Sequence, residues 1–126
     1  MRIAVDFDGT IVEHKYPDIG LPVIGAFVWL RSWQELGAEL VLWTCRDGIE
    51  LDEAVAFCKK NGVEFIGVNG VTDPFTQSPK VFANVYVDDA AFGCPLVQIW
   101  GGRPVVDWKI VGPAIEKRLK TSSRYR

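Results

Sequence analysis

Two kinds of apolar pattern alternate along this chain: short continuous runs, and apolar residues spaced three or four apart. The continuous runs predict buried strands at residues 2–6, 38–44, 65–68, 81–87 and 96–99. The spaced residues predict two helices, whose apolar faces are Val23, Phe27, Leu30 and Trp33, and then Leu51, Ala54, Val55 and Cys58. Pro22 suits the first turn of the earlier helix, and glycines at 37 and 62 predict where the two helices end.

A last helix is predicted between Asp107 and Lys120, with Asp107 as a candidate N-cap. Gly112 and Pro113 lie inside this span, so the pattern predicts either a kink or a later start. The polar, basic residues 121–126 are expected to form a flexible tail.

Strands that alternate with helices over short connections are typical of an α/β protein with a parallel sheet. We expect a doubly wound, Rossmann-like sheet of about five strands with helices on both faces. Residues 1–120 are expected to form a single domain, because no repeat, low-complexity tract or linker interrupts them.

Composition narrows the setting of the protein. The formal net charge of −2 is too balanced to indicate nucleic acid or membrane partners, although a nucleic-acid substrate stays open. Three scattered cysteines and a single histidine exclude a standard structural zinc site and a histidine-based triad, and they favour a reducing compartment. No signal peptide or membrane span is recognisable, so a cytoplasmic protein is predicted.

Polar residues follow the predicted strands at the edge where parallel sheets bind ligands. Asp6, Asp8 and Thr10 follow the first strand, and Thr44, Cys45 and Arg46 end or follow the second. Lys80 precedes the fourth strand, which Asp88 and Asp89 close. Crowded carboxylates repel one another unless a cation lies among them, and an oxygen-rich set of this kind suits Mg²⁺.

This arrangement predicts phosphoryl chemistry. Mg²⁺ and Lys80 would neutralise a phosphate ester so that a carboxylate can attack it, and the Thr44 hydroxyl and nearby backbone N–H groups, including that of Cys45, would hold its oxygens. Arg46 could clamp a substrate phosphate or be a surface arginine, and the pattern leaves both open. His14 could contact substrate, but an exposed loop histidine is the preferred interpretation.

The run Asp6-Phe7-Asp8-Gly9-Thr10 resembles the signature of the haloacid dehalogenase superfamily. The resemblance continues in order with Thr44 at the end of an apolar strand, then Lys80, then the pair Asp88-Asp89 after Val85-Tyr86-Val87. Together these motifs cover the chain from Ile3 to about Asp89.

The resemblance implies a role for each residue. Asp6 would be the nucleophile, forming a phosphoaspartate, and also a metal ligand. Asp8 would be the general acid and base, with its backbone carbonyl on the metal. Thr44 and Lys80 would bind the phosphoryl group, and Asp89, supported by Asp88, would complete the magnesium site.

The short intervals between the motifs leave no room for the cap domain that covers many active sites of this superfamily. The resemblance is thus to its small capless hydrolases, with a phosphorylated substrate that is either a small molecule or a macromolecule. A neighbouring subunit could cover the open site.

Two other functions stay open. A phosphoacceptor receiver domain also uses an acidic pair, a hydroxyl and a lysine around Mg²⁺, but its phosphorylated Asp ends the third strand, and no acid follows Val68 directly here. The second is a phosphate-binding module without catalysis.

Overall fold

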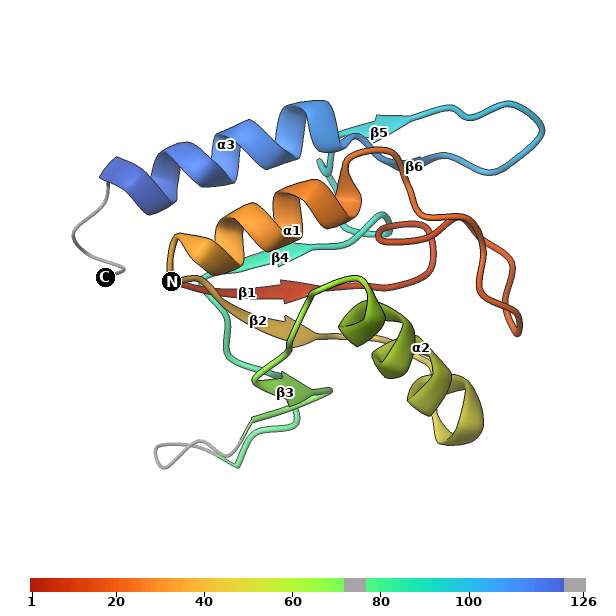
Figure 1. The fold of residues 1–126 in the computed structure, drawn as a ribbon, viewed down its shortest axis with the longest axis horizontal. Coiled ribbons are helices and arrows are strands. Elements are labelled where there is room, and N and C mark those ends of the chain that lie inside the picture. The colour runs from red at the N-terminus through yellow and green to blue at the C-terminus, as the bar shows by residue number, and fades with distance from the viewer. Residues whose placement is uncertain (72–76, 122–126) are drawn as a thin grey trace.

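A four-stranded parallel sheet forms the centre of the protein, whose computed structural model describes residues 1–71 and 77–121. The strands lie in the order β3-β2-β1-β4 and comprise β1 (Arg2–Val5), β2 (Glu39–Leu42), β3 (Gly67–Val68) and β4 (Val85–Val87). At the end of the central strand, Val5 pairs with Leu42 on one side and with Val87 on the other. The carboxyl ends of the strands therefore meet at one edge (Figure 1). The mixed α/β class and the parallel sheet are confirmed.

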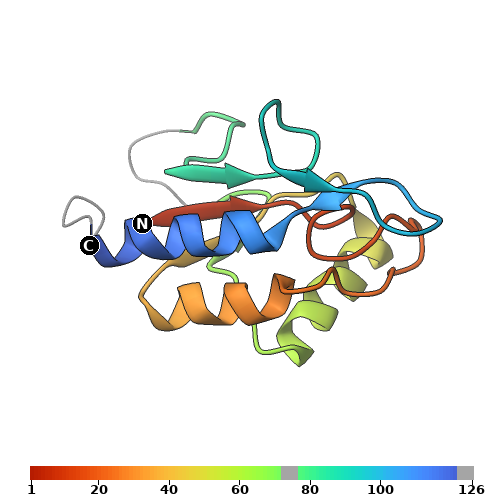
Figure 2. The same ribbon diagram turned by 90° about the horizontal axis from the view of Figure 1, so that it is seen from above.

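The three helices in the described part of the chain all pack on one face of this sheet. They are α1 (Ala26–Glu35), α2 (Gly48–Lys60) and α3 (Trp108–Thr121). Their buried residues join one core with Ile3 and Val5 of β1 and with Leu40 and Leu42 of β2, and α1 and α2 lie on the same side of the strands (Figure 2).

The opposite face carries Ala4 and Val41, because successive strand residues point to opposite faces. These two side chains pack with Val81, and with the partly buried Trp43, Val71 and Ala83. Among the described residues, coil rather than a helix covers this face, so the expectation of helices on both faces is not met. The coil runs along the sheet because β3 and β4 lie at opposite edges, and the chain must cross to connect them.

The expected fifth strand does not join the parallel sheet. It is β5 (Leu96–Val97), which pairs antiparallel with β6 (Val105–Val106) in a separate two-stranded sheet (Figure 1). Two short apolar pairs separated by a stretch containing Gly101, whose φ is 71°, are the signal for such a hairpin.

Two helix starts differ from the expectation. α1 begins at Ala26 rather than near Pro22, because the Val23 N–H donates to the carbonyl of Ile11 and holds this segment extended. α3 begins at Trp108 and continues through Pro113, so the later start is wrong. A side chain at Gly112 would overlap the indole of Trp29, so glycine allows α3 to pack closely on α1.

Thr121, expected in the tail, is the last residue of α3, and residues 122–126 lie outside the described part. None of the helices described here combines the length and the apolar character needed to cross a bilayer.

Candidate metal centre

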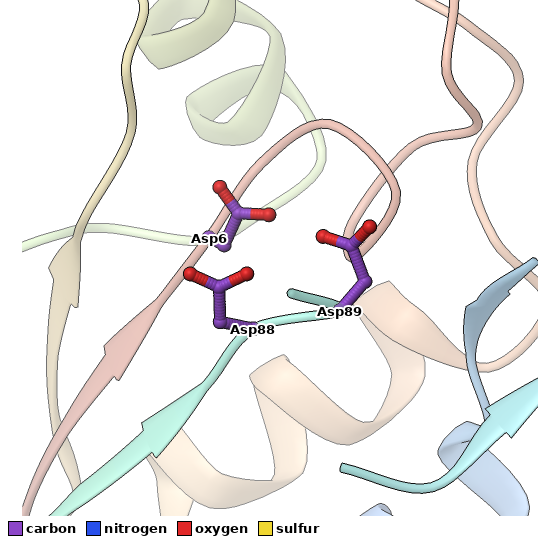
Figure 3. A group of neighbouring side chains, drawn as sticks. All are labelled: Asp6, Asp88 and Asp89. Atoms are coloured by element: carbon purple, nitrogen blue, oxygen red, sulfur yellow. The ribbon is translucent and has the colours of Figure 1, made fainter. Parts of the chain in front are cut away.

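Three carboxylates converge at the ends of two adjacent strands. Asp6 follows β1, and Asp88 and Asp89 follow β4, so the parallel pairing of β1 with β4 brings them together. One oxygen from each of the three lies within 4.8 Å of the others. The loop that follows Asp6 arches over the site beside Asp89 (Figure 3). The fold thus brings three of the predicted metal ligands together, and their carboxylates could hold a metal ion.

The electrostatics of this cluster favour a cation. Burial raises the pKa of Asp6 to about 8, and a hydrogen bond with Asp89 and the charge of Asp88 act in the same direction. Hydrogen bonds from Thr10 and from the Phe7 backbone oppose this rise. A divalent cation would offset the effects of burial and of the Asp88 charge, which otherwise keep a proton on Asp6. The donors are all carboxylate oxygens, which hard cations such as Mg²⁺ prefer.

Thr10 ties the two strand ends together. Its side chain is fully buried, and its Oγ1 donates to Asp6 Oδ2 at 3.0 Å and accepts from the Asp89 N–H at 3.2 Å. Its carbonyl accepts a hydrogen bond of 2.8 Å from Nε1 of Trp108, at the start of α3. The sequence analysis assigned no role to Thr10, although it lies in the motif. A hydroxyl four residues after a carboxylate in a tight turn is a signal for such a contact.

Asp8 lies outside the carboxylate cluster and pairs instead with Arg46. The guanidinium donates from Nε to Asp8 Oδ2 at 2.8 Å and from Nη2 to Asp8 Oδ1 at 2.7 Å. These contacts raise the pKa of Arg46, so its guanidinium stays protonated and positively charged. The Arg46 side chain is buried, so its interpretation as a surface arginine is wrong. The Asp8 carboxylate is not gathered with the expected metal ligands.

His14 lies against the cluster rather than in solvent. Its Nε2 is 3.1 Å from Asp89 Oδ2, a distance suited to an ion pair, yet the angles do not give a hydrogen bond. The imidazole covers Gly9, whose φ of 83° places the turn backbone directly beneath it. The preferred interpretation as an exposed residue is wrong, and the sequence held no pattern that could place the ring.

The three remaining candidates lie near the strand ends or the sheet face. The Thr44 N–H donates to Asn69 Oδ1 at 2.7 Å, and its Oγ1 accepts from the Arg46 N–H at 3.1 Å. Cys45, next in the chain, is exposed.

Lys80 is also exposed, and its ammonium lies 5.6 Å from the ring centroid of Tyr86. Tyr86 pairs with Ala4 in the middle of the sheet. Within residues 1–71 and 77–121, no ion pair or hydrogen bond joins the Lys80 side chain to the three carboxylates.

Comparisons with known proteins give one relative of established structure. No protein-family model matches the sequence, and no curated protein does so either. A solved structure described as that of a conserved protein coded by a locus of Bacteroides thetaiotaomicron is similar, with 38% sequence identity and a TM-score of 0.74. The similarity covers 94% of this chain and 91% of the other.

Proposed function

We propose that this chain, which belongs to the same family as the conserved Bacteroides thetaiotaomicron protein, is a magnesium-dependent phosphohydrolase. Its substrates would be phosphomonoesters, and the reaction would pass through a phosphoaspartate on Asp6. The observation that carries this proposal is the convergence of Asp6, Asp88 and Asp89 at the ends of β1 and β4.

The order of the strands supports the finer assignment of the fold. The order 3-2-1-4 is the first part of the Rossmann-like order, in which the chain winds to one side of β1 and then returns to the other. Ligands of such sheets bind at this point of reversal, beyond the carboxyl ends of the strands. Asp6 and Asp88 lie on either side of it, which is also where the proposed membership of the haloacid dehalogenase superfamily requires them.

The chemistry of the cluster fits magnesium. Asp6, Asp88 and Asp89 would hold the ion through their carboxylates, and the residues described here include no cation paired with Asp6 or Asp88. When bound, Mg²⁺ would supply positive charge to the phosphoryl oxygens and keep Asp6 ionised.

The protein residues would then divide the reaction between them. Asp6 attacks phosphorus and forms an acyl phosphate, while the bond from phosphorus to the leaving oxygen breaks and Asp8 donates a proton to that oxygen. In the second half, Asp8 takes a proton from water as the water attacks the phosphoaspartate, which regenerates Asp6 and releases inorganic phosphate. The hydrogen bond from Thr10 holds the Asp6 carboxylate in one orientation.

The phosphate-binding roles of Thr44, Cys45 and Lys80 stay predictions. Thr44 Oγ1 accepts a hydrogen bond from Arg46 and can still donate one to a phosphoryl oxygen. Lys80 would have to leave the ring of Tyr86 to reach the carboxylates. The cytoplasmic location and a neighbouring subunit over the site stay predictions as well.

The test is release of inorganic phosphate from a panel of aryl, sugar, nucleotide and oligonucleotide phosphates, with Mg²⁺ and with EDTA. We expect magnesium-dependent turnover that Asp6→Asn abolishes. The proposal fails if the purified protein releases no phosphate from the panel, or if Asp6→Asn leaves the rate unchanged.

The receiver-like alternative has less support. A receiver sheet has the flavodoxin-like order 2-1-3-4-5, with the third strand beside the first, whereas here β4 lies beside β1 and β3 lies at the edge. A phosphoaspartate that persists for minutes after incubation with acetyl phosphate would favour the receiver, since Asp8 is expected to hasten its loss.

A further inference from the structure

The guanidinium of Arg46 is almost completely committed to contacts within the protein. Besides Asp8, it donates from Nη1 to the carbonyl of Pro17 at 3.1 Å and from Nη2 to the carbonyl of Asp18 at 2.7 Å. Four of its five N–H groups are thus used, one on Nε, two on Nη2 and one on Nη1. The residue is only 2% exposed.

Aromatic rings add to these contacts. The guanidinium carbon lies 4.9 Å from the ring centroid of Phe7 and 5.2 Å from that of Tyr16, so the charge is held by cation–π contacts as well. A phosphate oxygen could take the one remaining donor, but a two-donor phosphate clamp would require Arg46 to give up a present partner.

We infer that Arg46 is a positioning residue that acts through Asp8, and not a residue that binds the substrate phosphate. It fixes the Asp8 carboxylate and residues 16–18 in a single arrangement beside the metal centre. The kinetic part of this inference rests on the proposed function, in which Asp8 protonates the leaving group.

A bidentate contact is suited to this task because it fixes both the position and the plane of the carboxylate. Each oxygen of Asp8 accepts one hydrogen bond from Arg46 and keeps a second lone pair for a proton. The Asp8 side chain is 21% exposed, against 1% for Arg46, so the carboxylate remains open on the side away from the guanidinium. Such a fixed orientation is what proton transfer to a leaving oxygen requires.

The same guanidinium also holds the loop of residues 14–18, which contacts the carboxylate cluster. The carbonyls of Pro17 and Asp18 bind to it, and His14 of this loop lies against Asp89. Loss of the guanidinium would therefore release this loop and Asp8 together. The carboxylates of Asp6, Asp88 and Asp89 would stay in place.

Kinetics with two leaving groups separate the possible roles. Arg46→Lys and Arg46→Met are compared with wild type on p-nitrophenyl phosphate, whose leaving group needs little protonation, and on a simple alkyl phosphate, whose leaving group needs a proton. We expect kcat to fall about 100-fold on the alkyl ester, the loss typical of a misplaced general acid, and less than about tenfold on the aryl ester. The ratio of the two losses does not depend on how much of the variant is folded.

Two further kinetic results bear on the inference. If Arg46 acts through Asp8, adding Arg46→Met to Asp8→Asn costs little more than Asp8→Asn alone on the alkyl ester. A phosphate clamp would instead raise KM equally for both esters and weaken inhibition by inorganic phosphate, and that result would overturn the inference. Arg31→Lys is the matched control, because Arg31 of α1 binds the carbonyl of Asn61, the residue after α2, and should leave both rates unchanged.

One readout needs no activity. In the substrate-free protein, Arg46→Lys should speed amide hydrogen exchange at residues 14–19 and leave magnesium binding by calorimetry unchanged. Unchanged exchange would show that Arg46 does not hold the loop and would overturn that part of the inference. A wild-type protein that hydrolyses neither ester would count against the proposed function, while the exchange result would still decide whether Arg46 holds the loop.

Discussion

The buried hydroxyl of Thr10 donates a hydrogen bond to Oδ2 of Asp6 across 3.0 Å. The same hydroxyl accepts from the N–H of Asp89, so it joins the end of β1 to the end of β4. Thr10 therefore sets the spacing between Asp6 and Asp89, although its own side chain carries no carboxylate.

Replacing Thr10 by valine keeps the shape of the side chain and removes the hydroxyl. The Asp89 N–H would lose its partner in a partly buried position, so we expect Thr10→Val to lower the free energy of unfolding by about 1–3 kcal/mol. Because Asp6 loses a stabilising donor, magnesium should also bind more weakly. Chemical denaturation and calorimetry measure the two effects, and Thr10→Ser, which keeps the hydroxyl, should retain most of the magnesium affinity.

A divalent cation should stabilise the folded protein through the carboxylate cluster. At a Mg²⁺ concentration 100 times its Kd, the free energy of unfolding should rise by about 2.7 kcal/mol. Asp6→Asn and Asp89→Asn should each remove most of this gain, whereas Asp52→Asn, an exposed residue of α2, should not. A stabilisation by Mg²⁺ that survives Asp6→Asn would place the ion elsewhere.

Stability without metal should fall as the pH rises. The pKa of Asp6 is raised from 3.8 to about 8, so between these values the folded protein binds a proton that the unfolded chain releases. The free energy of unfolding should therefore decrease from about pH 4 to about pH 8, by at most about 1.4 kcal/mol for each pH unit. Urea unfolding in EDTA at several pH values tests this, and Asp6→Asn should flatten the slope. A slope that is equal in wild type and Asp6→Asn would assign it to other groups.

The contact between His14 and the first loop can be tested with alanine at Gly9. A Cβ there would overlap the His14 imidazole and approach Asp89, and the φ of 83° adds strain for any L-residue. We expect Gly9→Ala to destabilise the protein more than Gly37→Ala, which has a similar φ of 92° but open space around it. Adding His14→Ala should recover part of the difference in thermal unfolding. No recovery would mean that His14 does not occupy this place.

The position of the carboxylate cluster could be predicted from the sequence because strand ends are local features. The apolar runs ending at Asp6 and at Asp88 defined two carboxyl edges, and parallel pairing then brought them together. Asp8 could not be placed in the same way. It stands two residues beyond Asp6, and the turn that includes Gly9 directs its side chain to Arg46, a residue 38 positions away.

Features that depend on the path of a long connection were also beyond local patterns. Lys80 belongs to the segment that connects β3 and β4, which lie at opposite edges of the sheet. Its place on the sheet face opposite the helices follows from that connection. The prediction that the fifth strand joins the central sheet was wrong for a similar reason. An apolar run alone does not determine its partner, which for Leu96–Val97 is the neighbouring hairpin strand β6.

The attachment of β6 and α3 to the first loop has a consequence for how the protein acquires its site during synthesis. The Val106 N–H donates to the Gly9 carbonyl and Trp108 Nε1 to the Thr10 carbonyl, so the earliest motif is completed by a late part of the chain. Because translation proceeds from the N-terminus, the carbonyls of Gly9 and Thr10, in the loop after Asp6, lack these hydrogen-bond donors until α3 has left the ribosome. A nascent chain stalled before Trp108 should therefore fail to retain magnesium, even though all three carboxylates have already been made.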